Sequence, residues 1–348
     1  MQINTLSEFL TQAGTEFRLF DLGRRLQAIE PADFVAIEAH QRPYPWPLQR
    51  HAWLAVCYWK THSADQPYIW FLKLPLDERG LLNNGAVKYF LAALVEQLGQ
   101  DLTAPLSDEQ QQNLAQTPFT FAPSPEKLAA FHARLGQVLH TPPSHFYQGA
   151  LDYLAAPTQH DWQQLGLQGL AEVAARLQSD APLSQLLVSQ WPHLPEPVQT
   201  ALCQQCEHQP LSDSVNQLLL DAVSHELERH MPDDERIALL LRATAASPTF
   251  IRRQQKIATL LSVAPSQALM LCLVARLWQE LADEALLLAY LSQLAERHGD
   301  LFNAVFSELV SLPVLRPLIL SNLHNPALAP ALKDALGALY TASATAST

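Results

Sequence analysis

Two cysteines and three histidines are of the residue types that bind zinc. Cys203 and Cys206 are separated by two residues, and His208, His225 and His230 follow them in the chain. Thiolates and imidazoles are ligands that Zn²⁺ prefers. However, the pattern predicts that both cysteines share one face of a helix without a knuckle glycine, and His225 and His230 have the wrong spacing for a zinc-protease helix. We therefore expect these to be core and surface residues, with no metal and no cofactor.

A charged loop follows the apolar run at residues 68–74. It contains Asp77, Glu78 and Arg79, and Asn83 comes shortly before the next expected helix. Loops on rigid scaffolds are where binding residues concentrate, so these four are candidates for binding a charged group of a partner. The alternative is a strand-to-helix turn with an internal Glu–Arg pair, because acidic residues stabilise helix starts. The turn is the favoured interpretation, and the binding hypothesis stays open.

Four tryptophans lie in the first quarter of the chain, at positions Trp46, Trp53, Trp59 and Trp70. Exposed tryptophans anchor protein partners or stack on nucleic-acid bases. Most of these residues have apolar neighbours, which favours packing within a core or on a sheet face. Partner anchoring remains the alternative, with Trp46 and Trp70 as its candidates.

The densest basic group is the run from Arg252 to Lys256. These two residues are four apart on an expected helix and could together bind an anion or an acidic segment. A solvated helix face is the default interpretation of such a charge run.

The sequence contains no nucleophile elbow, no phosphate-binding glycine loop and no dinucleotide fingerprint. The first hypothesis is therefore a non-catalytic scaffold or adaptor that binds a protein partner. The second is an enzyme with a polar site between two domains near Asp77, Glu78 and Arg79. The third is a small-molecule or peptide sensor with an apolar pocket lined by Trp53, Trp59 or Trp70.

The charge and the cysteine content limit the partners and the compartment. The chain of 348 residues has a net charge of −12, and both halves are acidic, which disfavours nucleic acid. Four scattered cysteines fit a reducing compartment. No secretory signal is recognisable, and no apolar stretch approaches the length of a membrane span. We expect a soluble cytoplasmic protein without a membrane partner. Homo-oligomerisation is possible but nothing indicates it.

The first hundred residues predict an α+β domain. Alternating and apolar runs form two hairpins, and helical patterns precede, separate and follow them, which gives the order αββαββα. A four-stranded antiparallel sheet with helices on one face fits this order. Gly23 is expected to take a positive φ in the first hairpin turn.

From residue 125 on, the sequence reads almost entirely as helix. Residues 101–124 predict a linker or irregular arm, and Ser124 is a helix cap before a proline. Breaks at proline or capping residues then recur, and late in the chain their spacing settles at roughly 13 to 18 residues, or about 33 per helix pair. This pattern predicts a solenoid-like array of helical hairpins over 125–340. Residues 341–348 are small and predict a disordered tail.

The loop also contains the short sequence Leu76-Asp77-Glu78. In this signature and in length, the chain resembles members of an uncharacterised bacterial protein family that is known only as a domain of unknown function. The resemblance spans most of the chain. It implies kinship, and it implies no activity, cofactor or partner.

Overall fold

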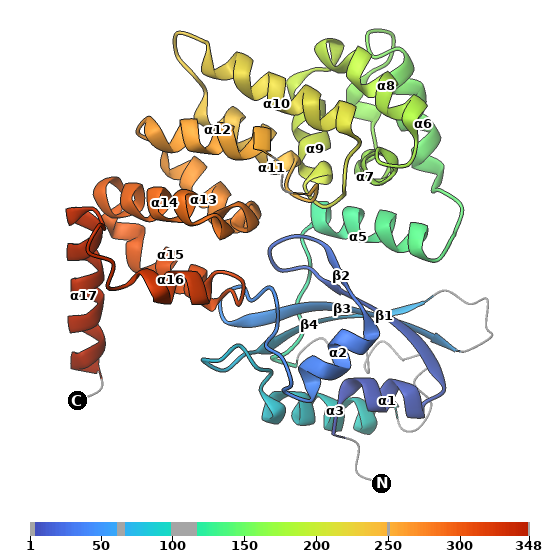
Figure 1. Ribbon diagram of the computed structural model, residues 1–348. Coiled ribbons are helices and arrows are strands. Elements are labelled where there is room, and N and C mark those ends of the chain that lie inside the picture. Colours follow the sequence, from blue (N-terminus) through green and yellow to red (C-terminus); the bar gives the residue numbers. More distant parts are fainter. Residues whose placement is uncertain (1–3, 61–66, 99–116, 249–250, 347–348) are drawn as a thin grey trace. The chain divides into compact units, whose positions relative to one another are not determined.

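The computed structural model describes residues 4–60, 67–98, 117–248 and 251–346 (Figure 1). The chain divides into two compact units. One comprises Met1–Pro123 together with Val310–Arg316, and the other comprises Ser124–Leu309 together with Pro317–Thr348. Among the described residues, no helix is both long and apolar enough to cross a membrane.

The first unit has the predicted order αββαββα. Its elements are α1 (Leu6–Gln12), β1 (Thr15–Asp21), β2 (Gln27–Ile29), α2 (Pro31–Glu38), β3 (His51–Lys60), β4 (Tyr68–Pro75) and α3 (Asn84–Leu98). The strands form one sheet in the order β2-β1-β3-β4, and every neighbouring pair is antiparallel. The prediction of a four-stranded antiparallel sheet with helices is confirmed.

Strand alternation determines which face of the sheet the helices cover. Leu19, Val56 and Trp70 are aligned across β1, β3 and β4, so their side chains point to the same face. This face joins one apolar core with Phe34 of α2 and Phe90 of α3. Figure 1 shows α1, α2 and α3 together on one side of the sheet.

The last part of the expected linker belongs to the sheet. Thr120 forms an isolated antiparallel bridge with Leu72, and the backbone N–H of Phe121 donates to the carbonyl of Phe71 at 3.2 Å. The segment therefore covers the open edge of β4, which would otherwise present unpaired backbone groups. Residues 101–116 of the expected linker lie outside the described residues.

The prediction for Gly23 is wrong, because its φ is not positive. A Cβ at this position would lie 3.3 Å from both Oδ2 of Asp21 and Cδ1 of Trp53. Close approach of these two side chains, rather than a left-handed backbone, explains the glycine.

The rest of the chain consists of packed helices, as predicted. They are α5 (Pro125–Val138), α6 (His145–Ala155), α7 (Leu167–Arg176), α8 (Ala181–Gln190), α9 (Glu196–Cys206), α10 (Asp213–Leu227), α11 (Asp234–Ala243), α12 (Ile251–Ser262), α13 (Gln267–Arg276), α14 (Glu284–Arg297), α15 (Gly299–Ser311), α16 (Arg316–Asn322) and α17 (Pro330–Ala346). Short 3₁₀ turns occur at Trp162–Gln164, Trp191–His193 and Trp278–Ala282.

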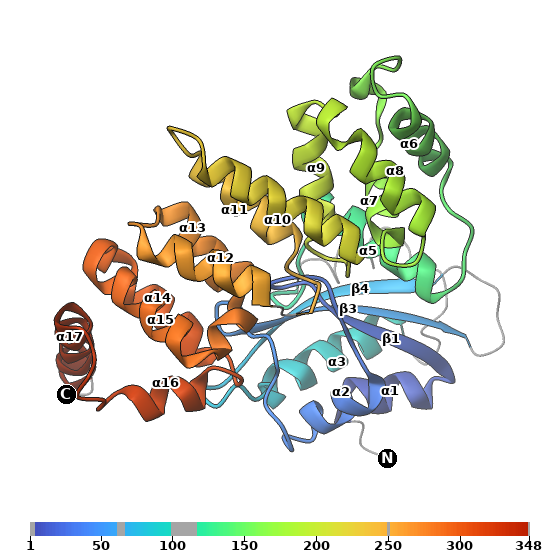
Figure 2. The same ribbon diagram turned by 45° about the horizontal axis from the view of Figure 1, so that its top comes forward.

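These helices contact one another in two rows. In one row α5 contacts α7, α7 contacts α9, α9 contacts α11, and α11 contacts α13. In the other row α6, α8, α10, α12 and α14 contact one another in the same stepwise manner. Figure 2 shows this succession of neighbouring helices. Helices that are two apart in the chain are thus direct neighbours. The same face of each helix in a row can therefore contribute to one continuous surface.

The sequence made two predictions about helix ends, and the structure agrees with one and differs from the other. The hydroxyl of Ser124 accepts a hydrogen bond from the N–H of Lys127 at 3.4 Å, so Ser124 caps α5 as predicted. The structure differs at the other end of the region, because α17 runs as one helix to Ala346, where a disordered tail from residue 341 was expected.

Candidate functional site

The loop with Asp77, Glu78 and Arg79 forms a self-contained turn. The Asp77 carboxylate accepts hydrogen bonds from the backbone N–H groups of Leu81 at 2.8 Å and Arg79 at 2.9 Å. It also pairs with the Arg79 guanidinium at 3.2 Å. The internal ion pair therefore involves Asp77, and not Glu78 as the turn hypothesis supposed. Arg316, which belongs to the same unit, donates to the backbone carbonyl of Glu78 at 3.1 Å.

These contacts also determine the acidity of the Asp77 carboxyl. Burial raises its pKa, but the hydrogen bonds from Leu81 and Arg79 and the charge of Arg79 outweigh burial and lower the pKa below its usual value. The carboxylate is thus ionised and already bonded within its own turn. Asn83 has a similar local role, because its Oδ1 accepts a hydrogen bond from the N–H of Ala86 at 3.1 Å at the start of α3.

The tryptophans are part of the sheet and its core. Trp46 and Trp70 are half-buried and pack against the core cluster, with the Trp70 ring edge-to-face to Phe90. Trp53 donates from Nε1 to the carbonyl of Leu48 at 3.0 Å, and the Arg18 guanidinium lies over Trp59. Trp46 and Trp70 thus pack with the core instead of sharing one exposed patch.

The potential zinc ligands are not assembled. Cys203 and Cys206 are buried in α9, and burial raises the pKa of the Cys203 thiol to about 12. His225 and His230 are exposed. Among the residues that the structure describes, no group of three or more His, Cys, Asp or Glu side chains is placed to hold a metal ion.

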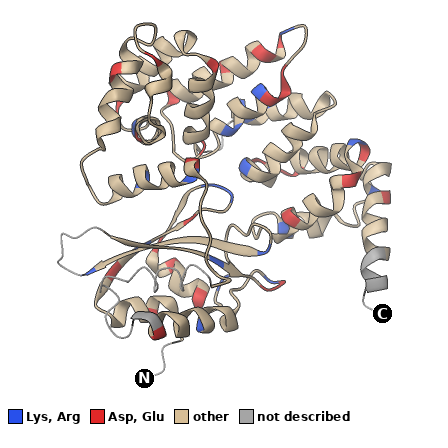
Figure 3. Cartoon of the chain, turned by 180° about the vertical axis from the view of Figure 1, so that it is seen from behind, with Lys and Arg blue, Asp and Glu red and all other residues tan. Residues whose placement is uncertain are grey.

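The basic run at the start of α12 lies at the surface in part. Arg252 forms an exposed ion pair with Asp221 of α10 at 2.9 Å, and Lys256 is half-exposed. Figure 3 shows Lys and Arg dispersed along the chain.

The structure contains a groove that the sequence did not reveal. It has a volume of about 500 Å³ and is formed by one face each of α9, α11 and α13. We call it the arginine groove. Its lining residues are Glu196, Thr200, Asp233, Glu235, Arg236, Ala238, Leu239, Arg242, Ala268, Leu271, Cys272, Ala275 and Arg276.

A buried carboxylate holds two of the groove's arginines in place. Glu207 lies at the end of α9 with its side chain only 2% exposed. Its Oε1 accepts a hydrogen bond from Nε of Arg276 at 3.1 Å, and its Oε2 accepts one from Nε of Arg242. His208 lies beside it, with Nε2 at 3.3 Å from Oε1. Three helices of one row thus meet at a single carboxylate.

The protonation states of this cluster follow from burial and charge. Burial alone would raise the pKa of Glu207, but His208 when it is protonated, and Arg276 and Arg242 at every pH, hold the pKa at about 2. Burial lowers the pKa of His208 to about 3, so this ring is neutral near pH 7. The two arginines are therefore the charges that keep Glu207 ionised at neutral pH.

We expect the protein to lose about 2 kcal/mol of stability between pH 6.5 and pH 5 because of His208. In an unfolded chain a histidine gains its proton near pH 6.5, whereas the buried ring does so only near pH 3. The unfolded state binds more protons throughout this window, so stability falls as the pH falls. Urea unfolding of His208→Gln at the two pH values measures the effect.

The control is His225→Gln, which changes an exposed histidine. It should keep the full pH dependence of the unfolding free energy, while His208→Gln loses most of it. Equal pH slopes in the two variants would contradict the assignment of this dependence to His208.

The charges of the groove are arranged by sign. Arg242 and Arg276 lie near the carboxyl ends of α11 and α13, and both are partly exposed. Glu196, Asp233 and Glu235 lie at the amino ends of α9 and α11. Arg236 also lies at the amino end of α11, so the amino ends carry three acids and one arginine, whereas the carboxyl ends carry only arginines.

The spacing along the chain contains a signal for this cluster. Arg242 is 35 residues after Glu207, and Arg276 is 69 residues after Glu207, so the two arginines are 34 apart (69 − 35). These intervals match the expected repeat of about 33 residues per helix pair. Residues that recur at the repeat period occupy equivalent places on successive helices of one row.

A protein-family model described as protein of unknown function, DUF3549, matches residues 1–340. The chain belongs to this family. The match covers both units and includes Leu76-Asp77-Glu78 and the arginine groove. Comparison with curated proteins and with solved structures gave no match.

Proposed function

We propose that this DUF3549 protein is a cytoplasmic, non-catalytic scaffold whose arginine groove binds an acidic segment of a partner protein. The observation that carries the proposal is the convergence of Arg242 and Arg276 on the buried carboxylate of Glu207. The two rows of helices support it, since stacked helices present extended surfaces for protein partners. Four unbridged cysteines, three of them buried, are compatible with a reducing compartment.

The arginines are preorganised to bind a carboxylate. Each uses its Nε atom for Glu207, and no described residue accepts a hydrogen bond from the Nη atoms of Arg242. Arg236 is anchored separately, through a hydrogen bond to Oε1 of Gln199. A guanidinium that is already fixed loses little side-chain entropy on binding, and its planar fork matches the geometry of a carboxylate.

The other walls of the groove suit a polypeptide. Ala238, Ala268 and Ala275 leave room between the helices, and Leu239 and Leu271 add apolar surface. An extended segment can place apolar side chains there and its acidic side chains towards the arginine end. The amino ends of α9 and α11 have a net negative charge, with three acids against Arg236, and this disfavours the reverse orientation.

The catalytic alternative has less support. The Asp77 carboxylate is already bonded to two backbone N–H groups and to Arg79, so it has no evident capacity for proton transfer. A lowered pKa also suits a structural carboxylate better than a general acid.

Charge reversal on the groove wall tests the proposal without breaking the Glu207 cluster. Leu271→Glu places a negative charge in the groove at a side chain that is 40% exposed. We expect a fluorescent Glu-rich peptide to bind the full-length protein, and this variant to bind it about 10-fold more weakly, which corresponds to about 1.4 kcal/mol. Fluorescence anisotropy measures both affinities.

Leu320→Glu is the matched control, because Leu320 is 48% exposed on α16 and does not line the groove. It should bind the peptide as the wild type does, and a Lys-rich peptide should not bind the groove. Added salt should weaken the wild-type complex. Equal affinity of the two leucine variants for the Glu-rich peptide would overturn the proposal.

A further inference from the structure

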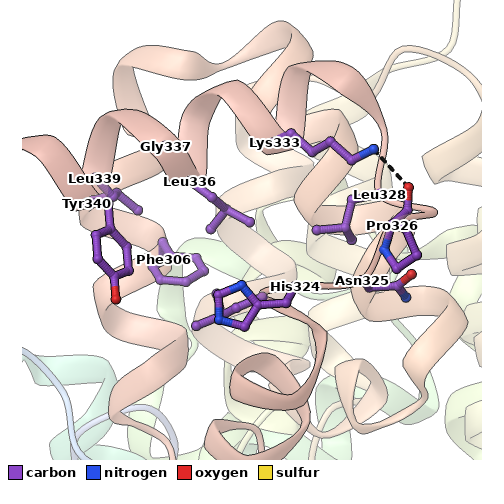
Figure 4. Close-up of a pocket in the computed structure, with 11 residues that line it drawn as sticks. Phe306, His324, Asn325, Pro326, Leu328, Lys333, Leu336, Gly337, Leu339 and Tyr340 are labelled. Carbon is purple, nitrogen blue, oxygen red and sulfur yellow. Dashed lines mark hydrogen bonds between the residues drawn. The ribbon is translucent and has the colours of Figure 1, made fainter.

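A second cavity lies among the last helices of the chain. Its volume is about 820 Å³, and it is lined by α15, by the segment that follows α16, and by α17 (Figure 4). We call it the α17 pocket. Its lining residues are Phe306, Leu323, His324, Asn325, Pro326, Leu328, Lys333, Leu336, Gly337, Leu339 and Tyr340.

The α17 pocket has an apolar interior and a polar rim. Phe306, Leu328 and Leu336 point into the same space in Figure 4. Lys333 stands at the rim and donates from Nζ to the carbonyl of Pro326 at 2.8 Å, and the ring of His324 borders the opening. Pockets of this size that combine apolar walls with a few polar groups are typical sites for small molecules.

Gly337 leaves space in this pocket. It lies within α17, where a glycine costs about 1 kcal/mol relative to alanine. A Cβ built on it would have no atom within 4 Å, so close helix packing does not require the glycine. A larger side chain at this position would project into the cavity that Gly337 lines. The glycine therefore keeps the pocket open at a cost to the helix.

The ionisable groups indicate the charge of the occupant. Lys333 and His324 line the pocket, and no Asp or Glu is among the described residues that do so. This differs from the chain as a whole, whose net charge is −12. The local complementarity is to an anion, and the interior is complementary to hydrocarbon.

We propose that the α17 pocket binds an amphiphile with an acyl chain and an anionic headgroup, such as a medium-chain carboxylate. The chain lies against Phe306, Leu328 and Leu336, and the headgroup meets the rim at Lys333. The inference is independent of the arginine groove, which is lined by other helices.

Calorimetric titration of the full-length protein with dodecanoate, below its micelle concentration, tests this site. We expect saturable binding with one site per chain. Gly337→Leu should weaken binding at least 10-fold, because its side chain fills the cavity, and it should not lower the thermal stability, because leucine favours a helix. Gly337→Ala adds one methyl group and should bind within about 3-fold of the wild type.

A second comparison examines the headgroup. Lys333→Gln should weaken dodecanoate binding about 5-fold and leave binding of dodecanol unchanged, and dodecyltrimethylammonium should bind more weakly than dodecanoate. The proposal is overturned if dodecanoate shows no saturable binding. An apolar side chain of a partner protein would then be the better candidate for the occupant of the pocket. It is also overturned if Gly337→Leu binds as well as the wild type.

Discussion

Arg253→Met is expected to destabilise the folded protein by about 3 to 5 kcal/mol. Arg253 is fully buried on α12, and its Nε donates to Oε1 of Glu280 at 2.6 Å. Its terminal nitrogens donate to the carbonyls of Thr244 and Ser247. Methionine keeps the volume but removes the charge, so Glu280, itself fully buried, loses its counter-charge. Denaturant unfolding measures the loss.

The adjacent arginine provides the control. Arg252→Met removes an exposed ion pair with Asp221, and such pairs contribute at most about 1 kcal/mol. The double variant Arg253→Met/Glu280→Leu should recover part of the loss, because it no longer buries an unpaired carboxylate. Similar unfolding free energies for Arg252→Met and Arg253→Met would contradict this account.

The same two arginines show where the sequence interpretation was incomplete. The run from Arg252 to Lys256 predicts a solvated face, which holds for Arg252. Arg253 points the other way, because one step along a helix turns the side chain by about 100°. It shares helical spacing with Ile257, Leu260 and Leu261, all buried. The helical periodicity was therefore sufficient to place Arg253 in the core. A buried guanidinium is stable there only because Glu280, which is distant in the sequence, neutralises its charge.

The sheet and the order of its elements could be predicted because the signals are local. Alternation over β3 and β4, a cap at Thr5 and a proline at the start of α2 each depend on a few adjacent residues. The role of Gly23 was not predictable in this way. It depends on Trp53, which lies 30 positions later in the chain (53 − 23) and approaches only when β1 and β3 pair.

The two sites differ in how far the sequence could have revealed them. The arginine groove depends on residues about 34 and 35 positions apart, and this spacing becomes informative only once a helix-pair repeat is aligned. The α17 pocket brings Phe306 of α15 together with Leu328 and Leu336, a contact between segments for which the sequence holds no local signal. The end of the last helix was taken for a disordered tail because its residues are small, although no residue beyond Tyr340 is among the described residues that line the pocket. Alanine has the highest helix propensity, so an Ala-rich end next to a helix can continue it.

Gly169→Ala is expected to destabilise the helical region by about 2 to 3 kcal/mol, which opposes what helix propensity alone predicts. Gly169 is buried in α7, which packs against α6. A Cβ at this position would lie 2.3 Å from the backbone carbonyl oxygen of Phe146, so a backbone and not a flexible side chain must move. The two helices can approach closely only because this Cβ is missing.

Gly149→Ala on the facing helix is the matched control, since a Cβ there has no atom within 4 Å. It should stabilise the protein by up to about 1 kcal/mol, because alanine favours the helix and meets no obstacle. Thermal unfolding followed by circular dichroism should therefore shift the Tm down for Gly169→Ala and slightly up for Gly149→Ala. If both variants raise the Tm, α6 and α7 pack less closely than the 2.3 Å between a Cβ at Gly169 and the carbonyl oxygen of Phe146 implies. That result would contradict the prediction.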